Sequence, residues 1–193
     1  RTAGALRVML RAGLVVLFWL WTGFAAADET VRICHGYGCL VEAEVQFSDA
    51  RLAEIGRELA VAVDAENERK ILAVVIGRLY GWAGEQSDIH NDRGGNYADA
   101  GVPGKMDCID HSTSTTRLLR LLEARGSLRW HRVLEPEARY WALVIPAHYS
   151  AVIEEKAVGE GAHFVVDSWF VDNGQPAVIL PLDEWKKGAG PDV

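Results

Sequence analysis

The hydrophobic periodicity of the chain changes near Gly126, from helical spacing before it to the alternation typical of strands after it. Gly126 stands where a left-handed C-terminal helix cap is expected. The apolar residues that share one helix face before it are Leu118, Leu119, Leu121 and Leu122. From residue 128 onward, short apolar runs separated by turns predict β-strands. The expected fold is therefore α+β, with N-terminal helices, including the one that carries Cys108, packed on a C-terminal antiparallel β-sheet.

Residues 1–27 have the layout of a secretory signal peptide. Three arginines form a basic leader, 16 uncharged residues follow from Ala12, and the stretch ends in a run of alanines at Ala27. Such a signal would direct the protein to the periplasm or out of the cell. Its cleavage near Ala27 would leave residues 28–193 as a single domain. An uncleaved membrane anchor is the alternative, although 16 residues fall short of the ~20 that span a bilayer.

The predicted mature domain is strongly acidic. The leader holds three of the 20 basic residues and none of the 27 acidic ones, so residues 28–193 carry a net charge of −10. Such a charge argues against nucleic acid and anionic membrane surfaces as partners, because both repel an acidic protein. Membrane contact is expected only if the N-terminal segment stays attached.

The three cysteines divide into a close pair and a single residue. Cys34 and Cys39 flank a glycine-containing turn, and in an oxidising compartment they are expected to form a small disulfide. His35 beside them suggests a metal site, but no second pair of ligands follows at a suitable spacing, so no metal is predicted. Cys108 is the odd cysteine, which in an exported protein is either an intermolecular link or a thiol kept free for use.

Helical patterns precede Cys108. Ser48 or Asp49 can cap them, and they continue to Tyr80 as one bent helix or two consecutive ones. Residues 81–107 then lack clear periodicity. A loop of this length inside a compact domain is usually functional or disordered, so we expect it to shape the entrance to Cys108.

Cys108 is placed at the start of the helix that ends near Gly126. Unpaired backbone N–H groups and the helix dipole stabilise a thiolate there, which makes Cys108 a candidate nucleophile with an accessible thiol of low pKa. Asp107 and Asp110 favour the helix start through its dipole, but they would also raise the pKa of the thiol. The competing interpretation is a small buried cysteine that only packs.

Two strand-like runs, residues 148–154 and 163–170, predict a β-hairpin with its loop centred near Val158. Pairing about this centre puts His148 and Asp167 nearly opposite each other or diagonally across the two strands, within side-chain reach. The register is the weak point of this prediction, because a slip of one residue would turn the two side chains to opposite faces.

Cys108, His148 and Asp167 together have the groups needed for thiol catalysis. The imidazole takes the thiol proton, and the carboxylate on the far ring nitrogen fixes the tautomer and stabilises the imidazolium. Backbone N–H groups at the helix start can bind the oxyanion. This chemistry requires no cofactor. Among the competing histidines, His163 is too far along its strand from Asp167, and His111 is expected to be exposed near the helix start.

The order and surroundings of these three residues resemble the transglutaminase-like branch of the papain-fold cysteine enzymes. Residues Met106-Asp107-Cys108-Ile109-Asp110 resemble its D-C-x-D core, residues 148–152 its histidine-bearing strand, and residues 165–169 its aspartate-bearing strand. The likeness covers roughly residues 100–172, and the exported layout is similar to that of uncharacterised bacterial proteins. It implies acyl transfer on an amide: peptide hydrolysis, amide hydrolysis or transamidation.

The same resemblance implies further features of the site. The family usually supplies an upstream polar side chain to the oxyanion hole, for which Asn96 and the region of Lys105 are candidates. In an exported enzyme the nearest amide substrates are peptidoglycan peptides and cell-envelope proteins. Two alternatives remain: a catalytically inactive binding domain of the same fold, and a thiol redox protein that uses Cys34 and Cys39.

Overall fold

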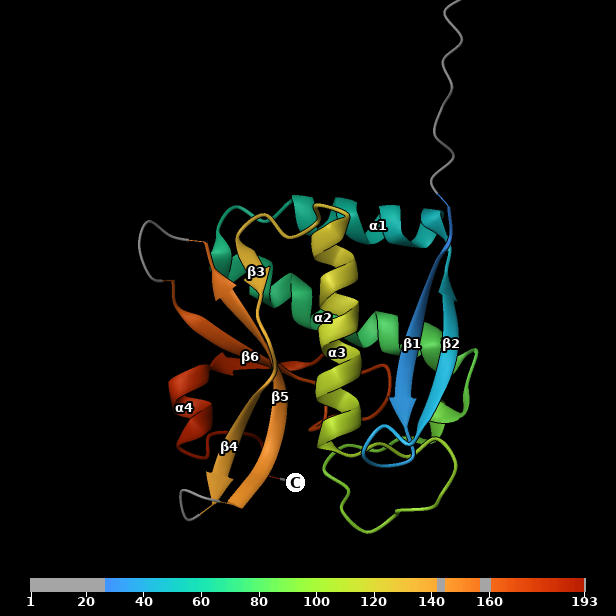
Figure 1. Cartoon of the computed structure of the whole chain (residues 1–193). Coiled ribbons are helices and arrows are strands. Elements are labelled where there is room, and N and C mark those ends of the chain that lie inside the picture. The colour runs from blue at the N-terminus through green and yellow to red at the C-terminus, as the bar shows by residue number, and fades with distance from the viewer. Residues whose placement is uncertain (1–26, 142–144, 157–160, 193) are drawn as a thin grey trace, which may run out of the picture.

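The computed structural model describes residues 27–141, 145–156 and 161–192. The predicted signal peptide therefore lies outside the described residues, apart from Ala27. Within these ranges, no helix combines the length and the apolar character needed to cross a bilayer. The elements form an α+β domain, as the change of periodicity predicts (Figure 1).

The chain begins with a β-hairpin. Strands β1 (Glu29–His35) and β2 (Val41–Phe47) pair antiparallel, with Glu29 opposite Phe47. The predicted disulfide between Cys34 and Cys39 is present and closes the turn between the strands. The hairpin packs along helix α3, beside which it is seen in Figure 1.

Two consecutive helices follow, rather than a single bent one. Helix α1 (Asp49–Ala60) begins at Ser48, whose side chain accepts a hydrogen bond from the backbone N–H of Arg51. Helix α2 (Ala65–Gly84) begins at Asp64, which caps it in the same way. The segment predicted as a loop from residue 81 is thus partly helical, because α2 runs to Gly84 and a short 3₁₀ helix, η1 (Asp88–Asn91), follows it.

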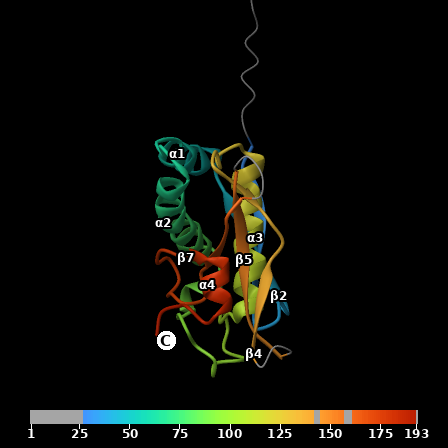
Figure 2. The same ribbon diagram turned by 90° about the vertical axis from the view of Figure 1, so that its left-hand side faces the viewer.

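Helix α3 (Cys108–Ala124) starts at Cys108 as expected. Its leucines at positions 118, 119 and 122 are fully buried in the main core. Gly126 follows the helix with a φ of 70°, a left-handed conformation that glycine adopts without strain. Helix α3 runs alongside strand β5 in both views (Figures 1 and 2).

The C-terminal part forms an antiparallel sheet with the order β3-β5-β6-β7, and β4 also pairs with β5. The strands are β3 (His131–Val133), β4 (Glu137–Trp141), β5 (Ile145–Glu155), β6 (His163–Asp167) and β7 (Val178–Pro181), followed by helix α4 (Leu182–Lys186). The apolar run 140–145 does not form one buried strand. Tyr140 and Trp141 end β4, Ile145 begins β5, the two strands pair with each other, and Tyr140 is exposed.

Each face of the sheet packs against different helices. Ala151 and Ile153 of β5 belong to the main core, which includes buried residues of α1, α2 and α3. Val152 and Val165 point to the other face, where they form a smaller cluster with Trp185 of α4. This alternation follows from the period of two along a strand.

Candidate active site

Cys108 is the first residue of α3, and its neighbours hold the helix start firmly. The Asp107 side chain accepts hydrogen bonds from the backbone N–H groups of Ile109 and Asp110, at 3.0 and 2.9 Å. The Asp110 side chain in turn accepts from the backbone N–H of Asp107 at 3.1 Å. This reciprocal capping box leaves the thiol at the positive end of the helix dipole.

The disulfide turn binds both of these carboxylates. Asp110 accepts from the backbone N–H groups of Tyr37 and Cys39, at 2.8 and 2.6 Å, and Asp107 accepts from Gly38 at 2.9 Å. The turn can present these groups because four consecutive residues from Gly36 to Cys39 have positive φ. The Cys34–Cys39 loop therefore holds the start of the helix that carries Cys108.

The Cys108 thiol is half-buried, and burial raises its pKa above the ordinary value. The carboxylates of Asp107 and Asp167 raise it further, whereas hydrogen bonding from the backbone of Tyr149 and from the N–H of Cys108 itself lowers it. The expectation of a low pKa from the helix start alone is thus wrong, because desolvation and two nearby anions outweigh the helix. These surroundings favour the neutral thiol over the thiolate.

The predicted pairing of His148 with Asp167 is confirmed. Nε2 of His148 lies 2.8 Å from Oδ2 of Asp167, and both residues are buried. The strands pair with Ala151 opposite Val166, so Asp167 is diagonal to His148 and on the same face of the sheet.

Asp167 has two further donors. The indole Nε1 of Trp185 donates to Oδ2 at 2.9 Å, and the backbone N–H of Trp169 donates to Oδ1 at 3.2 Å. Burying a carboxylate without partners would be costly in free energy. The three contacts offset this cost and fix the orientation of Asp167. The residues predicted for the site did not include Trp185.

Aromatic rings enclose His148. The centroids of Trp169, Phe170 and Trp185 lie 4.8, 5.4 and 5.7 Å from that of the imidazole. The Arg139 guanidinium lies over Phe170 and Trp185 and donates to backbone carbonyls near the C-terminus. The apolar surroundings strengthen the His148–Asp167 contact, since charge interactions are less screened away from water.

The Cys108 thiol lies near the strand that carries His148. Within the described residues, β6 pairs with β5 only from Ala151 onward, whereas the earlier part of β5 pairs with β4. The backbone of Tyr149, the residue after His148, is a hydrogen-bonding partner of the Cys108 thiol. The thiol comes from α3, the imidazole from β5 and the carboxylate from β6, and the thiol lies near the backbone of the residue that follows His148.

Asn96 and Lys105 take part in a cluster around Asp99. Asp99 accepts from the side-chain amide of Asn96 at 2.5 Å and from the Tyr37 hydroxyl at 2.5 Å, and pairs with the Lys105 ammonium at 2.9 Å. Burial and the neighbouring Asp99 raise the pKa of Tyr37 to about 12. These contacts order the loop beside the helix start. The role of Asn96 as an oxyanion donor stays a prediction.

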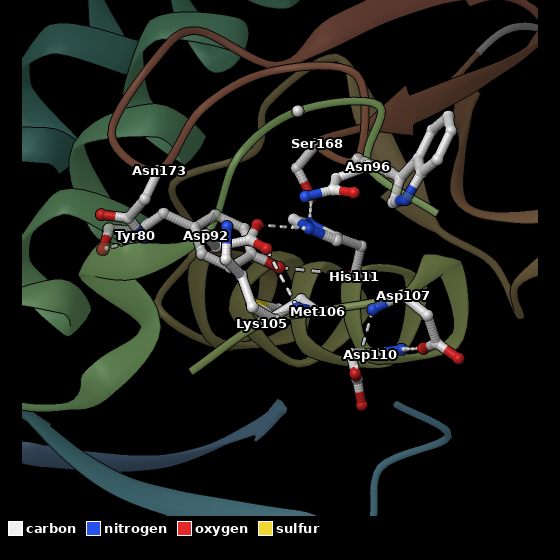
Figure 3. A network of polar contacts seen from close by, with 12 residues as sticks. Tyr80, Asp92, Asn96, Lys105, Met106, Asp107, Asp110, His111, Ser168 and Asn173 are labelled. Atoms are coloured by element: carbon white, nitrogen blue, oxygen red, sulfur yellow. Dashed lines mark hydrogen bonds and ion pairs between the residues drawn. The ribbon is translucent and has the colours of Figure 1, made fainter. Parts of the chain in front are cut away.

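His111 is buried rather than exposed, which corrects the prediction from its place near the helix start. Its Nδ1 lies 2.8 Å from the hydroxyl of Ser168, and its Nε2 lies 2.9 Å from Oδ2 of Asp92 (Figure 3). Neither Asp92 nor Ser168 was predicted to contact His111. No local pattern marks them, because each is brought to His111 by a turn of irregular structure.

The described part of the chain contains one group of side chains with metal-ligand spacing: Cys34, Cys39 and Glu42. The two sulfurs are bonded to each other, and a disulfide cannot supply the thiolates that a metal would need.

Comparison of the chain with protein-family models, with curated proteins and with solved structures found no match.

Proposed function

We propose that this protein is an exported thiol-dependent acyl-transfer enzyme that acts on an amide, with Cys108 as nucleophile, His148 as base and Asp167 as its orienting carboxylate. The main observation in its favour is the buried 2.8 Å contact between His148 and Asp167. The backbone of Tyr149, the residue after His148, is a hydrogen-bonding partner of the Cys108 thiol. A cysteine at a helix start beside a histidine and an aspartate on adjacent antiparallel strands supports the papain-like, transglutaminase-like arrangement that the sequence resembles.

The chemistry begins from a neutral thiol. Asp167 occupies Nε2 of His148, so Nδ1 is the atom that accepts the thiol proton as the sulfur attacks the amide carbon. The backbone N–H of Cys108 can donate to the oxyanion of the tetrahedral intermediate. The imidazolium then gives its proton to the leaving amine, and a thioester remains on Cys108. Water or a second amine releases the acyl group, with His148 acting again as base.

The test is acylation of the purified protein by p-nitrophenyl acetate. The released nitrophenolate is measured by its absorbance, and the acetylated protein is detected by intact-mass spectrometry. Wild type is expected to form an acetyl thioester that Cys108→Ala lacks, and His148→Ala is expected to slow its formation by about 10²-fold or more. Equal rates in wild type and His148→Ala would contradict the proposal. Peptides that resemble cell-envelope substrates, with water or an added amine as acceptor, would then distinguish hydrolysis from transamidation.

A binding domain without catalysis is the second candidate, and the raised pKa of Cys108 favours it. In that case the thiol stays protonated and the His148–Asp167 pair only stabilises the sheet. Such a protein would bind a cell-envelope peptide equally well with Cys108→Ala. A redox role for Cys34 and Cys39 is less favoured, because Cys34 is fully buried and the loop they close holds α3.

A further inference from the structure

The described residues contain two other buried histidine–carboxylate contacts besides the one in the site. His111 contacts Asp92 at 2.9 Å, and His131 contacts Glu68 at 2.8 Å. All four residues are buried. The His131–Glu68 contact joins α2 to β3, whereas the His111–Asp92 contact involves the segments that carry the site.

The His111 side chain connects three segments: the start of α3, the segment after η1 that carries Asp92, and the turn after β6 that carries Ser168. His111 lies one helical turn after Cys108, and its Nδ1 contacts Ser168, the residue that follows Asp167. Its Nε2 contacts Asp92, whose other oxygen accepts from the backbone N–H of Met106 at 3.0 Å, two residues before Cys108 (Figure 3). His111 thus links the segment that carries Cys108 to the residue that follows Asp167.

The hydrogen bonds of this cluster form a continuous chain. A carboxylate only accepts, so Nε2 of His111 donates to Asp92, and Nδ1 of the neutral ring accepts from the Ser168 hydroxyl. Ser168 accepts in turn from Thr115 at 2.9 Å, and Thr115 from Tyr80 at 2.9 Å. Each side chain of this cluster, from Asp92 to Tyr80, has a hydrogen-bond partner. Networks satisfied in this way hold a unique geometry.

We propose that His111 is a positioning residue of the thiol site, acting through Ser168 and Asp92 to hold Asp167, and with it His148, in reach of Cys108. The proposal rests on the proposed function. Its physical basis is the sensitivity of proton transfer to distance: a displacement of about 1 Å can cost about 10²-fold in rate. His111 does not touch the reacting atoms and supplies no proton to them.

The experiment measures alkylation of Cys108 by iodoacetamide near neutral pH in the full chain. The Ser168→Ala variant removes one hydroxyl from the cluster, and His111→Gln removes the ring. His131→Gln is the matched control, because it breaks a buried histidine–carboxylate contact of the same kind elsewhere. Positioned proton transfer contributes a factor of ~10²–10⁴ to a rate. We therefore expect the His148-dependent part of the alkylation rate to fall at least about tenfold in Ser168→Ala and in His111→Gln. It should stay within about twofold in His131→Gln.

Combined variants distinguish positioning from general destabilisation. Ser168→Ala added to His148→Ala should slow alkylation no further, since both changes act on the same step. Additive losses, or equal losses in Ser168→Ala and His131→Gln, would overturn the proposal.

A second readout does not require catalysis. The ring resonances of His148, observed by NMR in protein with labelled histidine, should shift in Ser168→Ala and not in His131→Gln. Unshifted His148 resonances in Ser168→Ala would overturn the positioning role. Should wild type and His148→Ala alkylate at the same rate, the proposed enzyme function fails, and these resonances still decide whether His111 positions His148.

Discussion

At the scale of single residues, the site is dominated by the environment of the Cys108 thiol. A helix start favours the thiolate, but the burial of the sulfur and the carboxylates of Asp107 and Asp167 act more strongly in the opposite direction. In the proposed mechanism the thiol therefore depends on His148 to take its proton, because the surroundings do not favour a thiolate in the resting site.

Replacing Asp107 with asparagine tests this balance. Asn caps helices as well as Asp does, so α3 is expected to stay intact while one nearby negative charge is lost. The thiolate then becomes less unfavourable, and the pKa of Cys108 should fall. The midpoint of the pH profile of alkylation should move to lower pH, whereas the exposed Asp183→Asn control should not move it. An unchanged midpoint in Asp107→Asn would show that the carboxylate does not act on the thiol.

Replacing Trp185 with phenylalanine tests the hydrogen bond to Asp167. The ring remains beside His148, but the donor to the carboxylate is removed, which should cost about 1.5–3 kcal/mol in the free energy of unfolding. Acylation should also slow several-fold, because Asp167 is less well held. Trp130→Phe is the control, since the Nε1 of Trp130 is buried without a partner among the described residues. Urea unfolding should separate the two variants, and equal losses would contradict the role of Trp185.

At the scale of elements, the start of α3 is held by the turn between β1 and β2. Backbone N–H groups of Tyr37, Gly38 and Cys39 bind the carboxylates on either side of Cys108. The disulfide closes this turn, in which Tyr37 and Cys39 have a left-handed conformation that non-glycine residues adopt only at a cost.

Removal of the disulfide should loosen this contact. In the Cys34→Ala/Cys39→Ala variant we expect a loss of about 2 kcal/mol in the free energy of unfolding, from the loop entropy that so short a closed loop supplies. Cys108 should also react less selectively, because the helix start is less ordered. Wild type treated with dithiothreitol should show the same loss. A variant as stable as wild type would mean that the turn keeps its shape without the disulfide.

At the scale of the whole molecule, buried polar groups join the N-terminal helices to the sheet. Glu68 of α2 accepts from the backbone N–H groups of Arg129 and Trp130, at 2.7 and 3.1 Å, and contacts His131 at 2.8 Å. Burial raises the pKa of Glu68, but these contacts outweigh it and hold the pKa below its ordinary value. The carboxylate thus stabilises the fold in its ionised form.

The pH dependence of folding follows from the direction of this shift. A carboxyl group whose pKa is lower in the folded state stabilises the protein above its unfolded pKa of ~4.3 and loses this contribution as the pH falls through the folded value. Glu68→Gln should therefore be less stable than wild type at neutral pH, and the difference should shrink on acidification below about pH 4. Urea unfolding at several pH values measures it. A difference that is constant with pH would contradict the assignment to the charged form.

Local patterns in the sequence predicted most of the helices and strands and the contact between two residues of the candidate site. The helix caps, the break at Gly126 and the alternation in β5 and β6 are short-range properties, so they could be predicted without knowing the packing. The disulfide of Cys34 and Cys39 and the pairing of His148 with Asp167 also follow from neighbouring segments. Both are confirmed.

Only the tertiary structure decided the features that depend on segments far apart in the chain. The burial of His111 requires Asp92 and Ser168 to meet on one face of α3. The donor from Trp185 requires α4 to fold back on β6. The direction in which the pKa of Cys108 shifts depends on the burial of the thiol and on charges that include Asp167, from a distant part of the chain. Periodicity and spacing report the neighbourhood of a residue along the chain, whereas burial and electrostatics are set by what packs against it from elsewhere.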